Sequence, residues 1–142
     1  MDIPAGVSGL VLDSWPILEW LKGRQPASGR FREIVEAAFD GRISLLMSRM
    51  NYGEVVYSVR KDFPAERLEQ ILKAFREIPI HFYSVDDALV DEAAALKSLH
   101  AISYADAFAA ALAMRLNLPL LTGDRELLVL RQMGLSIHWL GT

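Results

Sequence analysis

The chain has 142 residues, of which 52% are hydrophobic and 23% are charged, and this supply of apolar side chains suits one compact domain spanning residues 1–142. It contains no cysteine, which excludes disulfides, thiolate metal sites and cysteine nucleophiles and favours a reducing, cytoplasmic location. The first nine residues lack lysine and arginine, and no run of 18 apolar residues occurs. We therefore expect neither an export signal nor a membrane span.

The net charge of −3 bears on the class of partner. Affinity for a phosphate backbone comes largely from lysine and arginine, so an acidic chain at first argues against nucleic acid. If several of the acidic side chains instead face bound cations, the rest of the chain is slightly basic. The charge balance therefore neither supports nor excludes a nucleic-acid partner.

Short apolar runs alternate with helical patterns along the chain. Five runs are too short for packed helices and predict strands, at residues 9–12, 43–47, 78–82, 118–121 and 135–140. Helices that connect successive strands favour a mostly parallel sheet covered on both faces. The expected fold class is therefore α/β, a three-layer α/β/α arrangement around about five strands.

The predicted helices are marked by their starting residues and by apolar positions three and four residues apart. In chain order they begin near Ser14, after Ser28, behind Ser48, at Pro64, at Ser84, at Ser103 and at Arg125. Ser84 with Asp87 and Ser103 with Asp106 have capping-box-like spacing. The helix after Ser28 ends before Gly41, and the last one runs to about Met133.

Four acidic residues stand at the borders of these elements. Asp13 and Asp124 follow predicted strands, Asp106 lies in the first turn of an alanine-rich helix, and Glu54 lies in a helix just after Gly53. Loops that leave the carboxyl ends of parallel strands share one edge of the sheet, where ligands bind. The pattern therefore predicts that these carboxylates meet at one edge.

Each acid taken singly also has an ordinary structural explanation. Asp13 and Asp124 each suit the N-cap of the helix that follows, Asp106 suits the third residue of a capping box, and Glu54 suits a solvated helix face. Together they fit a hard cation such as Mg²⁺, which prefers oxygen ligands. Without a cation, clustered carboxylates repel and raise one another's pKa.

Four sequence blocks resemble the PIN-domain family, specifically the small VapC-like toxins. The blocks are VLDSW around Asp13, SRMNYGEV around Glu54, ISYADAFAAALA around Asp106 and LPLLTGDREL around Asp124. Each block alone is short and of low specificity. Their shared order and spacing extend the resemblance over nearly the whole chain.

The resemblance implies a metal-dependent ribonuclease that is the toxin of a type II toxin–antitoxin pair. It makes Asp13, Glu54, Asp106 and Asp124 the Mg²⁺ or Mn²⁺ ligands and the catalytic set. It gives Ser14 and Thr122 a supporting role. It also implies an RNA substrate, a small antitoxin that covers the acidic groove, and a homodimer.

One position departs from the family pattern. Many relatives carry a second aspartate and a phenylalanine just past the last acidic position, whereas this chain has Glu126 and Leu127. A fifth acidic contribution therefore depends on the longer Glu126 side chain.

The implied reaction is phosphodiester hydrolysis by hydroxide, assisted by one or two cations. No histidine is needed for it, and His81, His100 and His138 fall outside the acidic blocks. Arg49 and Arg125 stand near the acids and are candidates for substrate phosphate contacts. Their alternative role is that of solvated surface residues.

Three other functions compete with this hypothesis. A phosphoacceptor receiver domain also gathers acids at a sheet edge, and Asp86 and Asp87 follow the third predicted strand, but residues 135–142 lack the lysine such a site needs. The second is a noncatalytic PIN-like binding module. The third is an RNA-processing or DNA-directed nuclease of the same fold rather than a toxin.

Overall fold

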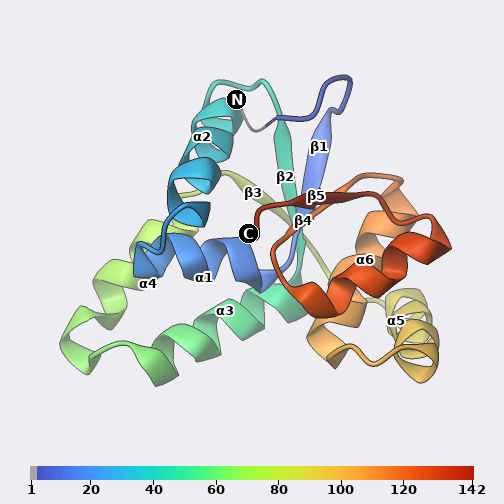
Figure 1. The fold of residues 1–142 in the computed structure, drawn as a ribbon. Coiled ribbons are helices and arrows are strands. Elements are labelled where there is room, and N and C mark those ends of the chain that lie inside the picture. Colours follow the sequence, from blue (N-terminus) through green and yellow to red (C-terminus); the bar gives the residue numbers. More distant parts are fainter. Residues whose placement is uncertain (1–2) are drawn as a thin grey trace.

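A computed structural model describes residues 3–142 of the chain, which form a parallel five-stranded sheet of order β3-β2-β1-β4-β5 (Figure 1). The strands are β1 Gly9–Leu12, β2 Ser44–Ser48, β3 Ile80–Tyr83, β4 Leu120–Thr122 and β5 Ile137–Trp139. Every strand pairs with its neighbours in parallel. The five expected strands are present, each within two residues of its predicted start, and the α/β fold class is confirmed.

Helices connect the strands and cover both faces of the sheet (Figure 1). The α-helices are α1 Ser14–Lys22, α2 Ala27–Phe39, α3 Arg49–Asp62, α4 Leu68–Arg76, α5 Asp87–Leu99 and α6 Tyr104–Leu116. Two 3₁₀ segments complete the chain, η1 Ala65–Arg67 and η2 Arg125–Met133. None of the helices described between residues 3 and 142 is both long and apolar enough to cross a membrane.

The three layers follow from alternation along the central strands. Leu10 and Leu12 of β1 pack into a core with α1 to α4. Val11, which lies between them, packs into a second core with α5, α6 and η2. Successive strand residues point to opposite faces, so a strand with no polar residue serves two cores at once. Both helix layers are thus anchored on the same buried strands.

Several helix starts differ from the expectation. Asp86, rather than Ser84, caps α5, because its carboxylate accepts the Leu89 N–H at 2.8 Å. Helix α2 already begins at Ala27, ahead of Ser28. After Pro64 the chain first forms the 3₁₀ segment η1, and the last predicted α-helix is the 3₁₀ segment η2.

The strand order reverses beside β1. The chain passes from β1 to β2 and β3 on one side, then returns to place β4 and β5 on the other side. In open parallel sheets the crevice at such a reversal, outside the carboxyl ends of the strands, is where ligands bind. A ligand site is therefore expected at the carboxyl ends of β1 and β4.

Candidate metal centre

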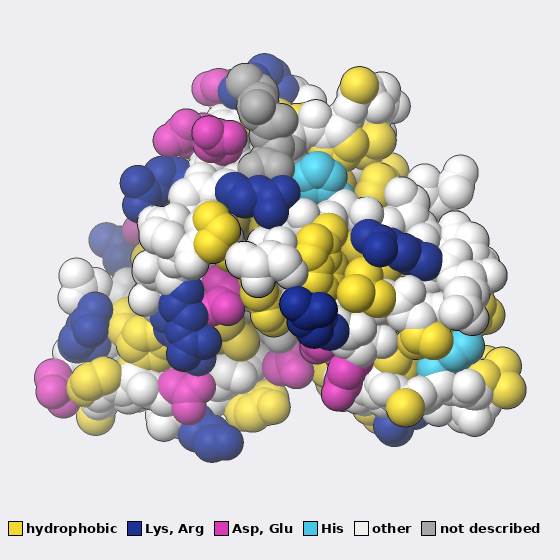
Figure 2. Space-filling view, in the orientation of Figure 1, with side chains coloured by type: hydrophobic (Ala, Val, Ile, Leu, Met, Phe, Trp, Pro, Cys, Tyr) yellow, Lys and Arg dark blue, Asp and Glu magenta, His cyan; other side chains and the backbone are white. Residues whose placement is uncertain are grey.

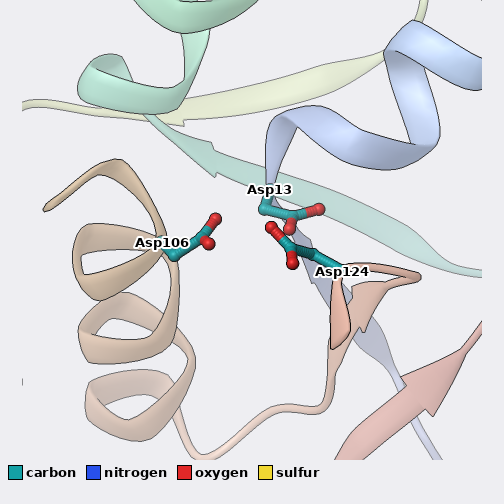
Figure 3. A group of neighbouring side chains, drawn as sticks. All are labelled: Asp13, Asp106 and Asp124. Carbon is teal, nitrogen blue, oxygen red and sulfur yellow. The ribbon is translucent and has the colours of Figure 1, made fainter. Parts of the chain in front are cut away.

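Three aspartates converge at the reversal point. Asp13 follows β1, Asp124 follows β4 by one intervening residue, and Asp106 comes from the first turn of α6. Each contributes a carboxylate oxygen to a group whose members all lie within 4.8 Å of one another. Figure 3 shows the three carboxylates pointing toward a common space from three separate segments.

These aspartates take part in helix capping and also belong to the candidate metal site. The Oδ1 atom of Asp13 accepts the Trp15 N–H at 3.2 Å, and Oδ1 of Asp124 accepts the Glu126 N–H at 3.0 Å. Ser103 Oγ accepts the Asp106 N–H at 3.1 Å. Capping fixes each short segment at a helix N-terminus, where backbone N–H groups favour negative charge. It also leaves carboxylate oxygens free for a further partner.

Thr122, at the end of β4, joins two of the aspartates. Its hydroxyl donates to Oδ2 of Asp13 at 2.7 Å and accepts the backbone N–H of Asp124 at 3.0 Å. The hydroxyl is fully buried. This single group therefore fixes both the orientation of the Asp13 carboxylate and the backbone that carries Asp124.

Gly123 allows this arrangement to close against α1. A Cβ at position 123 would overlap the ring of Trp15, which lies directly over the glycine. The strand end that carries Asp124 can therefore approach α1 only without a side chain at this position. The close approach explains the glycine between Thr122 and Asp124.

Glu54 and Ser14 line the same cavity as the three aspartates. The cavity has a volume of about 340 Å³. Glu54 is only partly buried, and the group of oxygens within 4.8 Å comprises the aspartates without it. Among residues 3–142, its Oε1 atom and Oδ2 of Asp106 are buried and accept no hydrogen bond. Glu126 lies on the wall of the cavity.

Asp13 and Asp106 resist ionisation in the absence of a cation. Burial raises the pKa of Asp13 from 3.8 to about 8, and the charges of Asp124 and Glu54 act in the same direction. The Thr122 hydroxyl partly opposes this rise. The pKa of Asp106 is also raised strongly, first by burial and then by the carboxylates of Asp13, Asp124 and Glu54. The ionised forms of Asp13 and Asp106 are thus unfavourable beside the neighbouring carboxylates.

The donor set fits a hard divalent cation. It offers carboxylate oxygens alone, which are the ligands that Mg²⁺ and Mn²⁺ prefer. The unpaired buried oxygens of Asp106 and Glu54 point to the same conclusion, because buried acceptors without a partner are costly. A cation of charge +2 would relieve both the repulsion and the missing partners.

Basic residues that the sequence did not single out border the cavity. Lys22, the last residue of α1, and Arg24, two residues beyond it, line the cavity together with the acids. Each has a weak acidic partner: Lys22 lies 3.5 Å from Asp62, and Arg24 lies 3.5 Å from Glu19. Figure 2 shows Lys and Arg side chains interspersed with acidic ones on this face.

The two arginines proposed from sequence lie elsewhere. The guanidinium of Arg49 sits over the rings of Tyr52 and Phe82, and Arg125 donates to the Thr142 carbonyl at 3.2 Å. Neither is among the residues that line the acidic cavity. The three histidines are also absent from its lining.

Asn51 is a buried polar residue that the sequence reasoning passed over. Its side chain accepts the Ser48 hydroxyl at 2.6 Å and donates to the Ala105 carbonyl at 3.0 Å. Ala105 immediately precedes Asp106, so Asn51 ties the start of α3 to the turn that carries an acid. The signal available in the sequence was an amide three residues after a capping serine.

Fold and site together define a class: a doubly wound α/β protein with a carboxylate cluster, suited to a divalent cation, at its topological switch point. The model of the PIN-domain family matches residues 10–132, which is most of the chain. The chain therefore belongs to the PIN-domain family.

Solved structures agree with this at the level of fold. A VapBC2 complex from Rickettsia felis, bound to a promoter DNA fragment, is 15% identical, with 91% of this chain and 96% of that chain covered and a TM-score of 0.69. A DNA-bound VapBC from Salmonella typhimurium is 19% identical over 92% and 96%, with a TM-score of 0.67. The sarcin–ricin-loop-cleaving toxin VapC20 of Mycobacterium tuberculosis is 12% identical over 81% and 89%, with a TM-score of 0.64.

Comparison with curated proteins gives no match. The family, the VapC-like fold and the aspartate cluster together support a nuclease.

Proposed function

We propose that this protein is a ribonuclease that hydrolyses phosphodiester bonds with the help of Mg²⁺, or Mn²⁺ in its place. The observation that carries the proposal is the convergence of Asp13, Asp106 and Asp124 oxygens within 4.8 Å of one another at the sheet edge. Within residues 3–142, the buried Oδ2 atom of Asp106 has no hydrogen-bond donor that would stabilise its negative charge. The three aspartates and Glu54 are the residues that would hold the cation.

The cation, when bound, supplies Lewis-acid activation of water and stabilises the charge that develops on the phosphate. The protein's part is to hold the carboxylates in fixed positions around the place of the cation. Thr122 fixes Asp13 by its 2.7 Å hydrogen bond, and Asn51 fixes the turn before Asp106. Lys22 and Arg24 stand at the rim, where they would attract the phosphate backbone of RNA.

The first test replaces one ligand without changing its size. Asp106→Asn keeps the side-chain volume but removes the negative charge, so RNA cleavage in the presence of Mg²⁺ should fall by about 100-fold or more. Cleavage of a labelled single-stranded RNA is followed on a gel, with and without EDTA. The circular dichroism spectrum should not change, because the variant removes a repulsive buried charge.

A matched control is Asp91→Asn, which removes an exposed carboxylate from α5, outside the residues that line the acidic cavity. It should cleave at the rate of the unaltered protein. Undiminished, EDTA-resistant cleavage by the Asp106 variant would contradict the proposed metal site. Absence of cleavage by the unaltered protein in Mg²⁺ and Mn²⁺ would favour the noncatalytic binding module instead.

The toxin role is the finer part of the proposal. It is supported by the VapBC structures and by a toxin–antitoxin complex from Klebsiella pneumoniae among the similar structures. We propose that this chain likewise has an antitoxin partner, forms a homodimer and acts in the cytoplasm. Growth arrest on expression, relieved by co-expression of a short open reading frame next to its gene, would separate a toxin from an RNA-processing or DNA-directed nuclease.

A further inference from the structure

A second groove lies beside the acidic cavity and shares Glu54 with it. Its volume is about 360 Å³, and its walls come from α3, from Val85 after β3 and from Ala105 at the start of α6. Ala105 directly precedes Asp106, so the two hollows meet at both α3 and α6. We call this hollow the α3 groove.

One side of the α3 groove is a stripe of α3. Met50, Gly53 and Tyr57 are spaced three and four residues apart and therefore share one helical face with Glu54. The Tyr57 side chain is 59% exposed, and Met50 is 38% exposed. A Cβ built at Gly53 would meet no atom within 4 Å, so the groove floor is open where a flat ligand would enter.

Arg49 adds a positive charge to the same groove. Its guanidinium is held 4.8 Å above the Tyr52 ring centroid and 4.7 Å above that of Phe82. Among the residues the structure describes, Arg49 has no carboxylate within ion-pair distance. An exposed guanidinium that is oriented by aromatic rings and not neutralised is suited to an anionic or planar partner.

We propose that the α3 groove binds one unpaired base of the RNA substrate, next to the phosphate that is cleaved, by stacking on Tyr57. The proposal rests on the ribonuclease function proposed above. Unpaired bases are bound through aromatic side chains and arginine planes, because every base has a π-face, whereas paired bases are not free to enter such a groove. Continuity with the acids through Glu54 places the base beside the reacting phosphate. Arg49 is positioned to meet the backbone of the same nucleotide.

The test compares Tyr57→Ala with Tyr57→Phe and with Phe39→Ala. Phe39 lies at the end of α2, outside both hollows, and is 63% exposed, which makes it a control of matched exposure. Binding of a short single-stranded RNA is measured by fluorescence anisotropy in the Asp106→Asn background, so that the RNA stays intact. Tyr57→Ala should weaken binding about tenfold or more, whereas Tyr57→Phe and Phe39→Ala should bind as the parent does.

A second arm identifies the base. One abasic nucleotide is moved stepwise through the RNA, and the position that weakens binding to the parent should have no further effect in Tyr57→Ala. The abasic position should adjoin the bond that the unaltered protein cleaves. A duplex of the same sequence should show no dependence on Tyr57.

Three outcomes would overturn the inference. The first is equal binding of single-stranded RNA by Tyr57→Ala and its parent, and the second is a loss of binding from Tyr57→Ala that adds to the loss from every abasic position. The third is a change of oligomeric state in Tyr57→Ala, measured by light scattering. The last would assign the α3 groove to contact between copies. Because binding is read separately from cleavage, equal binding by an active nuclease would reject the groove and leave the proposed function standing. Tyr57-dependent binding, together with no cleavage by the unaltered protein, would reject the proposed ribonuclease function and leave the groove as an RNA-binding site.

Discussion

Thr122 shows how a single hydroxyl organises two acids. It donates to Asp13 Oδ2 at 2.7 Å and accepts from the Asp124 backbone at 3.0 Å, and the whole side chain is buried. The same hydrogen bond lowers the pKa of Asp13 against the larger effect of burial. A residue that would not itself be a ligand therefore determines how readily its neighbour can become one.

Thr122→Val keeps the shape of this side chain and removes both hydrogen bonds. The free energy of unfolding should fall by about 1–3 kcal/mol, because a buried carboxylate oxygen of Asp13 and the partly buried N–H of Asp124 each lose a partner. The affinity for Mn²⁺ should fall about tenfold or more, since Asp13 would lose its orienting donor. Chemical denaturation and calorimetric titration measure the two quantities. Thr122→Ser keeps the hydroxyl and should retain most of the stability and most of the Mn²⁺ affinity. Equal losses of these quantities in Thr122→Val and Thr122→Ser would contradict the role of the hydroxyl.

At the scale of elements, α3 and α6 are joined where they carry the site. Asn51, near the start of α3, spans from the Ser48 cap to the Ala105 carbonyl at the start of α6. The residue is fully buried, so its hydrogen bonds are not shared with solvent. The spacing between the Glu54-bearing helix and the Asp106-bearing helix therefore depends on one amide.

Asn51→Ala should lower the free energy of unfolding by about 1–3 kcal/mol, because the Ser48 hydroxyl and the partly buried Ala105 carbonyl each lose their partner. It should also weaken Mn²⁺ binding, although Asn51 is not among the residues that line the acidic cavity. The control is Gln70→Ala, which removes an exposed amide from α4 and should alter neither quantity. Full cation affinity in a destabilised Asn51 variant would show that the amide serves packing alone.

At the scale of the whole molecule, the site sits where two cores meet. The β1 and β4 strands are buried on both faces, and their carboxyl ends deliver Asp13 and Asp124 into a space that α6 closes with Asp106. Burial makes the acids rigid and also makes their charge unfavourable, so folding without a cation places carboxylates in a poor environment. Stability and cation binding should therefore be linked.

The sign of that linkage follows from the raised pKa of Asp13. Its folded pKa of about 8 exceeds the ordinary 3.8, so the folded protein keeps a proton that the unfolded chain releases. In EDTA, the resulting stability is full below about pH 4 and is lost as the pH rises toward about 8. Asp106, whose pKa is also raised, acts in the same direction.

We therefore expect the melting temperature in EDTA to fall between about pH 5 and about pH 8, and excess Mg²⁺ to restore it at the higher pH. Asp13→Asn should flatten the dependence and lose most of the Mg²⁺ effect. Differential scanning fluorimetry at both pH values measures this. A melting temperature that rises with pH in EDTA would contradict the assigned environment of the aspartates.

The sequence alone predicted the five strands, the α/β class and the acidic residues of the candidate site. Short apolar runs separated by helical periodicity predicted five strands and the α/β class, because local patterning dictates which residues must be buried. Asp13, Asp106 and Asp124 were identifiable because each stands at a strand end or helix start. The exact start of α5 was missed, because two nearby residues, Ser84 and Asp86, both suit a cap, and local pattern does not rank them.

Only the tertiary structure decided which side chains share a space. It brought three aspartates within 4.8 Å, placed Glu54 on the wall of their cavity, and put Lys22 and Arg24, rather than Arg49 and Arg125, at the rim. It also showed that Asp13 and Asp124 are helix caps and members of the cluster at once. These relations depend on strand order and helix packing, which bring together residues far apart in the chain, and no local pattern records such distances.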